Sequence, residues 1–182
     1  MATPPDFSSG AVLTAAQMSA VGCWLIKTQA VGTGVATIDV TSAFSSDYQN
    51  YRITYSGGVA STNININMQF GVGATFTATN YFGGVAYINV GGGVWQLSAN
   101  NGGTSFIGGS ARAAGANMCL EIQQPNIALD TYAQGPFTRL DNGQVGHTWI
   151  TQAGTTQFTS FRLTTSSGTL TGGTIRVYGY RN

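Results

Sequence analysis

The chain has 182 residues, of which 7% are charged, and its formal net charge is +1. Ordinary soluble domains contain roughly 25% charged residues, so neutral polar groups must solvate most of this surface. Lysine and arginine together number 7 and are scattered, which argues against the clustered positive charge of a nucleic-acid binder. The sequence has no run of about 18 apolar residues, and we expect neither nucleic acid nor a membrane as a partner.

The first 22 residues predict an N-terminal arm and one short helix. Two early prolines disfavour helix over residues 1–12, which we expect to be extended. Thr14 is a suitable N-cap residue, and Gln17 three positions later completes a capping box for a short helix. We expect residues 1–22 to form an appendage and residues 23–182 to form one domain, which is long enough to bury a core.

The rest of the chain predicts strands. From Trp24 onwards, apolar and polar residues alternate with a period of two, as in strands with one buried face. The alternating runs are 24–29, 36–40, 51–55, 63–70, 81–90, 94–97, 118–123, 137–140, 145–150, 158–164 and 174–180. Asn142-Gly143, between two of these runs, is a strong hairpin signal. We predict an all-β fold: a jelly-roll-like β-sandwich of about ten strands with an N-terminal arm and one short helix.

The last run is expected to be central to the sandwich. Ile175 and Val177 fall on one side of an extended chain and should face the core, while Arg176 and Tyr178 fall on the other side. Because the connection from the preceding run is short, we expect that run to lie beside it. The neighbours expected on that run are Phe161 and Leu163.

No motif of a catalytic or metal site is present. The sequence has no phosphate-binding loop, no HExxH and no paired CxxC, and its six acidic residues form no close carboxylate pair. An enzyme would have to use Glu121 or His147, but strand residues of this kind are more often structural. We expect a protein that is not an enzyme and has no cofactor. Cys23 and Cys119 permit one disulfide, and we favour two buried free thiols.

Aromatic residues, at 11% of the chain, are more numerous than one small core requires. They suit a core with cross-strand pairs, or a contact surface in which tyrosine and tryptophan contribute strongly to binding. The residues that a sugar-binding surface would use are Tyr87, Trp95, Gln96, Asn100 and Asn101. We favour the core and an oligomer interface over sugar binding, because glycine-rich loops hold a glycan's hydrogen-bond partners poorly.

Three blocks of the sequence resemble virion structural proteins of tailed bacteriophages, a group of minor tail, fibre and decoration-type proteins. The blocks are 6–18 (DFSSGAVLTAAQM), 44–53 (FSSDYQNYRI) and 168–180 (GTLTGGTIRVYGY). The resemblance implies a β-sandwich component of the phage particle that is commonly multimeric, and a homotrimer is the expected assembly. Residues 60–160 carry no such block and would hold whatever this chain binds.

The resemblance leaves the position on the particle open. A tail-associated fibre, tip or baseplate component is the first expectation, with a host-surface glycan as one candidate partner. A capsid decoration or head-fibre protein is the alternative. A secreted carbohydrate-binding module is less favoured because the N-terminus shows no signal peptide, and a depolymerase is the enzyme alternative. We expect the chain to be made in the host cytoplasm and to become part of the virion.

Residues 1–22 are expected to anchor the chain to another virion protein. A helix of about eight residues is not stable alone, so it must dock on a neighbour or on its own domain. The apolar side chains expected to make this contact are Phe7, Val12, Leu13 and Met18.

Overall fold

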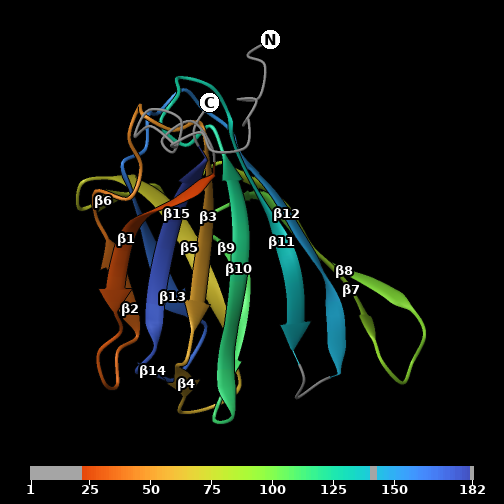
Figure 1. Ribbon diagram of the computed structural model, residues 1–182. Coiled ribbons are helices and arrows are strands. Elements are labelled where there is room, and N and C mark those ends of the chain that lie inside the picture. Colours follow the sequence, from red (N-terminus) through yellow and green to blue (C-terminus); the bar gives the residue numbers. More distant parts are fainter. Residues whose placement is uncertain (1–21, 140–142, 181–182) are drawn as a thin grey trace, which may run out of the picture.

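The computed structural model describes residues 22–139 and 143–180, in which every regular element is a strand (Figure 1). The all-β sandwich prediction is confirmed. The predicted arm and short helix lie outside the described residues. Among the described residues there are fifteen strands, more than the ten expected, and three of these have only two residues each. The short strands are β4 (Val59–Ala60), β6 (Thr75–Phe76) and β14 (Leu170–Thr171).

Eight longer strands build the two layers of the sandwich, and all neighbours are antiparallel. The first layer contains, in spatial order, β1 (Cys23–Ala30), β15 (Thr174–Tyr180), β3 (Asn50–Ser56) and β10 (Gly115–Gln123). The second contains β2 (Thr37–Val40), β13 (Ser160–Thr165), β5 (Ile64–Val72) and β9 (Phe106–Arg112). The layers join at β10, whose residues 115–117 pair with β9 and whose residues 118–123 pair with β3.

Four further strands extend the first layer beyond β10. They are, in spatial order, β11 (Thr131–Arg139), β12 (Gln144–Gln152), β7 (Tyr81–Asn89) and β8 (Trp95–Gly103). Figure 1 shows this extension diverging from the sandwich, with the β7–β8 hairpin at its far end. Antiparallel pairing of β11 with β12 confirms the predicted hairpin, and its register runs out to Arg139 opposite Gln144.

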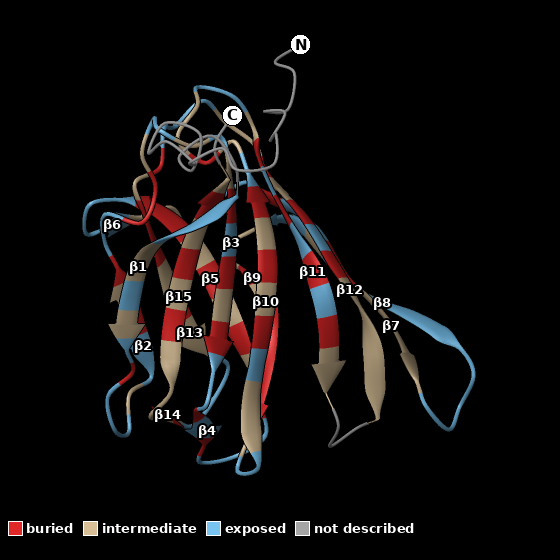
Figure 2. Ribbon diagram, viewed as in Figure 1, coloured by how far each residue is buried: buried red, intermediate tan, exposed pale blue. Residues whose placement is uncertain are grey.

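The core lies between the two layers and is formed by buried residues of both sheets. In Figure 2 these buried stretches are red. The alternation in the sequence places every second residue there, so that β5 buries Ile64, Ile66, Met68 and Phe70. The Phe70 ring packs at 5.4 to 6.2 Å from four other aromatic rings. Those distances suit aromatic pairs, which add to the stabilisation that burial provides.

The last strand confirms one prediction and corrects another. Ile175 and Val177 are fully buried, whereas Arg176 and Tyr178 are only partly buried, as the alternation predicts. However, β15 pairs with β1 and β3, whereas β13 lies in the opposite layer between β2 and β5. The connection crosses between the layers through β14. Phe161 and Leu163 therefore share a core with β15 but do not lie beside it in a sheet.

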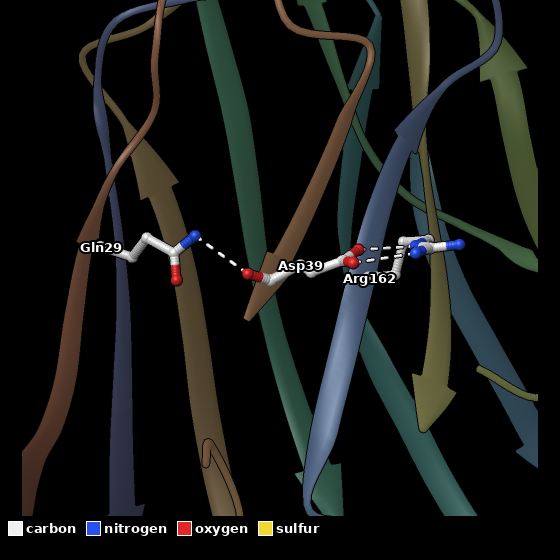
Figure 3. A network of polar contacts seen from close by, with 3 residues as sticks. All are labelled: Gln29, Asp39 and Arg162. Atoms are coloured by element: carbon white, nitrogen blue, oxygen red, sulfur yellow. Dashed lines mark hydrogen bonds and ion pairs between the residues drawn. The ribbon is translucent and has the colours of Figure 1, made fainter. Parts of the chain in front are cut away.

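One edge of the sandwich is held by polar contacts between its layers (Figure 3). The Gln29 side chain of β1 donates a hydrogen bond to the main-chain oxygen of Asp39 in β2, at 3.0 Å. The Asp39 carboxylate in turn accepts two bonds from Arg162 of β13, at 2.6 and 2.8 Å. This bidentate geometry is the strongest form of a carboxylate–guanidinium contact.

Both cysteines are free, which confirms the prediction that no disulfide forms. Cys119 is partly buried, and burial raises the pKa of its thiol. Cys23 is exposed, so the expectation that it would be buried is wrong. The reason is its position at the start of β1, an edge strand paired only with β15 among the described strands.

Candidate functional site: an aromatic hollow and an exposed hairpin

The outward face of the sheet extension carries a hollow of about 420 Å³. Its side chains come from β10, β11, β12 and β7, and we call it the aromatic hollow. It is lined by Phe82, Gly83, Gln123, Tyr132, Ala133, Gln134, Trp149, Ile150 and Thr151. A hollow of this volume falls in the range of roughly 300–1,000 Å³ that is usual for small-molecule sites.

Antiparallel register places the polar and aromatic side chains of the hollow in two rows across the strands. In one row, Gln134 faces Trp149. In the next row, Tyr132 lies between Gln123 and Thr151, and Phe82 follows on β7. Directly opposite residues share a face of a sheet, so all of these side chains project outward. Tyr132 and Trp149 are diagonal neighbours on adjacent strands.

Glycines on β7 leave room beside the indole ring. Gly84 lies opposite Trp149, so that β7 places no side chain next to the ring. A Cβ atom at Gly84 would lie 2.2 Å from the main-chain oxygen of Ser98. At Gly83 the φ angle is +121°, and a Cβ atom would lie 2.1 Å from the main-chain oxygen of Trp149. Larger residues would therefore displace the strands that shape the hollow.

The three rings of the hollow are unusually accessible for large aromatic side chains. Trp149 is 51% exposed, Tyr132 43% and Phe82 38%. The imidazole of His147 stacks on Trp149, with ring centroids 4.3 Å apart. Among the described residues, none of those lining the hollow is charged. Its chemistry is therefore aromatic and amide in character.

Glu121 and His147 both have contacts that account for their positions. The Glu121 carboxylate is 2.5 Å from the Arg52 guanidinium and accepts a hydrogen bond from the Tyr180 hydroxyl at 3.2 Å. The Nδ1 atom of His147 is 2.8 Å from the main-chain oxygen of Thr148, so this nitrogen acts as the donor. The two residues lie on the same outward face, where Glu121 is opposite Gln134 and Gln134 is opposite Trp149.

The hairpin at the end of the extension exposes a second apolar surface. We call it the β7–β8 tip, and its large side chains are between 66% and 68% exposed. They are Val90, Val94, Trp95 and Leu97. Figure 2 shows that β8 and the loop before it are exposed. Almost every residue of β8 is exposed, so neither face of this strand is covered.

The five residues predicted for a sugar-binding surface are divided between two faces. Tyr87 and Gln96 face each other across the hairpin, on the side where Tyr87 contacts the Phe137 ring at 6.4 Å. The Asn100 amide shares that side and donates a hydrogen bond to the main-chain oxygen of Ser105 at 3.1 Å. On the other face lie Trp95 and Asn101, the latter opposite Phe82. They do not form a single site, and the predicted anchor residues Phe7, Val12, Leu13 and Met18 lie outside the described residues.

The residues that do meet in the hollow gave only a weak signal in the sequence. They come from four strands and are separated by up to about seventy residues along the chain, from Phe82 to Thr151, and no local motif links them. Tyr132 and Trp149 each stand between residues that the structure buries, in an alternating run. That pattern marks them as exposed aromatic residues, but only the strand register brings them together.

Comparisons with protein-family models, with curated proteins and with solved structures found no match to this chain. Within residues 22–139 and 143–180, no group of His, Cys, Asp and Glu side chains is placed to hold a metal ion. No helix of that part of the chain is long and apolar enough to cross a membrane.

Proposed function

We propose that this chain is a non-enzymatic structural protein of a tailed-bacteriophage particle, and that copies associate through the β7–β8 tip. The resemblance of three sequence blocks to virion structural proteins is the reason for proposing that the chain belongs to a phage particle. The exposure of the apolar tip is the observation that supports self-association. The proposed assembly is a trimer, and the proposed position is tail-associated, with capsid decoration or a head fibre as the alternative. Both rest on the resemblance alone.

The strand order supports a virion role. Along the eight sandwich strands from β1 to β15, successive strands lie in opposite layers, except that β5 and β9 are neighbours in the second layer. A jelly roll built of two Greek keys is connected in this way. In such a description β7 and β8 are an insertion between β5 and β9, and β11 and β12 an insertion between β10 and β13. Jelly rolls are common in viral coat proteins and lectins. We therefore propose that the sandwich is a jelly roll.

The single observation that carries self-association is the exposure of the tip on both of its faces. A two-stranded hairpin is marginally stable by itself, and edge strands are normally protected by charge or proline. The β8 sequence, WQLSANNGG, contains neither. A second copy that covered Trp95 and Leu97 would remove apolar surface from water and satisfy the free edge of β8.

Light scattering of the purified protein tests the association. We expect the wild-type chain to have the mass of a trimer at micromolar concentration, and the double variant Trp95→Ser/Leu97→Ser to have a smaller mass with an unchanged circular dichroism spectrum. Val72→Ser is the matched control, because Val72 is a 48% exposed apolar residue on β5, in the second layer and outside the tip. A monomeric wild-type protein would contradict the proposal.

Electron microscopy of the particle tests its location. An antibody or gold label directed at this chain should mark the tail, fibre or baseplate. A label on the capsid would replace the tail-associated position by the decoration or head-fibre alternative. A particle that carries no label, from a host that expresses the protein, would contradict a virion role.

A further inference from the structure

We propose that the aromatic hollow is a binding site for a neutral saccharide. The residues that line the hollow are different from those of the β7–β8 tip, through which we propose self-association. The proposal does not require that the chain be part of a virion. It rests on the rings, the free amide groups and the absence of charge in the hollow.

Trp149 and Tyr132 provide apolar surfaces for the ligand. A sugar ring carries C–H groups on its faces and hydroxyl groups around its edge, so it can pack on an aromatic ring while its edge stays polar. The two side chains are diagonal neighbours on β11 and β12, a spacing of about 7–8 Å between Cα atoms. Rings at that spacing can contact one ligand together, and Phe82 extends the surface onto β7.

Gln123 and Gln134 provide hydrogen-bonding groups that the protein itself does not use. Within the described part of the chain, neither side-chain amide has a protein partner, whereas those of Gln29, Gln69 and Asn100 each donate to a main-chain oxygen. An amide has both donors and an acceptor, which match a sugar hydroxyl, itself both donor and acceptor. Two free amides beside exposed rings therefore fit a ligand rich in hydroxyl groups.

The electrostatics of the hollow favour a neutral ligand. No charged residue among those that the structure describes lines it, and the charged groups that follow in the row of Gln134, Glu121 and Arg52, are paired with each other at 2.5 Å. An anionic sugar or phosphate would be desolvated there without a cationic partner. A flat apolar protein surface is also disfavoured, because it would bury both glutamine amides without satisfying them.

An array of oligosaccharides tests the proposal, with neutral hexose and N-acetylhexosamine chains in one arm and sialylated and sulfated chains in the other. We expect binding to at least one neutral chain, which isothermal titration calorimetry then quantifies. Trp149→Ala and Gln134→Ala should each weaken that binding by about tenfold or more. Trp24→Ala is the matched control, because Trp24 is an exposed tryptophan on β1, outside both the hollow and the tip, and the substitution should leave affinity unchanged.

Four outcomes would overturn the proposal. Binding of charged chains alone would exclude the neutral class, and an array with no bound neutral chain would exclude a saccharide. Equal loss of affinity in Trp149→Ala and Trp24→Ala would place the site elsewhere. A smaller mass of Trp149→Ala in light scattering would identify the hollow as an interface between copies. Circular dichroism of each variant shows that the fold is retained, and none of these results depends on incorporation into a particle.

Discussion

Individual tyrosines connect loops to the core. Three tyrosine side chains are almost completely buried, and burial raises the pKa of each hydroxyl. Each of these hydroxyls donates a hydrogen bond to a main-chain oxygen: Tyr51 to Ser45, Tyr55 to Gly172 and Tyr81 to Thr77. The Tyr81 hydroxyl also accepts a bond from the Phe70 amide at 2.7 Å. A buried polar group without a partner is costly, so these bonds fix the positions of the loops.

Tyrosine ionisation should make the protein less stable at alkaline pH. Burial of Tyr180, with its hydrogen bond to Glu121 and the charge of that carboxylate, raises its pKa to about 12. In an unfolded chain the pKa is about 10. The stabilisation is therefore complete below pH of about 10 and is lost as the pH rises from there to about 12. Urea unfolding across this range should show a decreasing free energy of unfolding.

The variant Tyr180→Phe separates the contribution of Tyr180 to this pH dependence from that of the other tyrosines. Phenylalanine keeps the ring but cannot ionise, so the free energy of unfolding of the variant should decrease less steeply between pH of about 10 and 12. The buried tyrosines remain in the variant and should still produce part of the decrease. Equal slopes for the two proteins would show that Tyr180 does not contribute.

At the scale of the strand, β15 occupies the middle of its layer, with β1 on one side and β3 on the other. We expect Ile175→Ala to lower the free energy of unfolding by about 2–5 kcal/mol, because the side chain is fully buried and would leave a cavity. Arg176→Ala should cost less than about 1 kcal/mol, since Arg176 projects outward and its bond to Ser56 is long, at 3.4 Å. Chemical denaturation of both variants measures the difference, and the reverse order would contradict the assigned faces of β15.

The positions of strands could be predicted from the sequence where the alternation of apolar and polar residues was strong. Which strands pair with one another in a sheet could not be predicted in this way. The run 63–70 became β5 and buries the predicted face, because period two reports local geometry. Phe161 and Leu163 were assigned to the wrong layer, because pairing depends on contacts between distant residues. Residues 100–103 lie beyond the predicted run 94–97, yet they belong to β8. Pairing with β7 outweighs the low strand propensity of asparagine and glycine there.

The candidate site was harder to predict than the fold for the same reason. Tyr87 and Trp95 are close in sequence and looked like one surface, but strand alternation places them on opposite faces of the hairpin. Trp149 and Gln123 are far apart in sequence and line the same hollow. Their proximity follows from the register of β10, β11 and β12, which no local pattern specifies.

At the scale of the whole molecule, the low charge of the chain agrees with a protein that functions in an assembly. Few charges keep copies apart, so exposed apolar surfaces such as the β7–β8 tip would promote uncontrolled association in a monomer. A closed oligomer would cover the tip and prevent this. The neutral outward face of the extension would then remain available for ligands.

Removal of residues 1–22 should separate folding from incorporation into the particle. The first described strand begins at Cys23, so the truncated chain keeps every described strand pair and should fold with an unchanged circular dichroism spectrum and melting temperature. The four predicted anchors, Phe7, Val12, Leu13 and Met18, would be lost. Burying four such side chains at about 25 cal/mol per Å² supplies several kcal/mol before ordering costs, so the truncated protein should fail to join the particle.

Particles assembled in a host that supplies only the truncated chain provide the measurement, with the purified particles probed for the protein. The full-length double variant Phe7→Ser/Leu13→Ser is a second test, because it removes two predicted anchors and keeps the length of the chain. We expect it to reduce incorporation in the same direction as the truncation, since both remove apolar contact area at the same interface. If the truncated chain unfolded, residues 1–22 would be part of the domain. If it were incorporated normally, the anchor would lie in the sandwich.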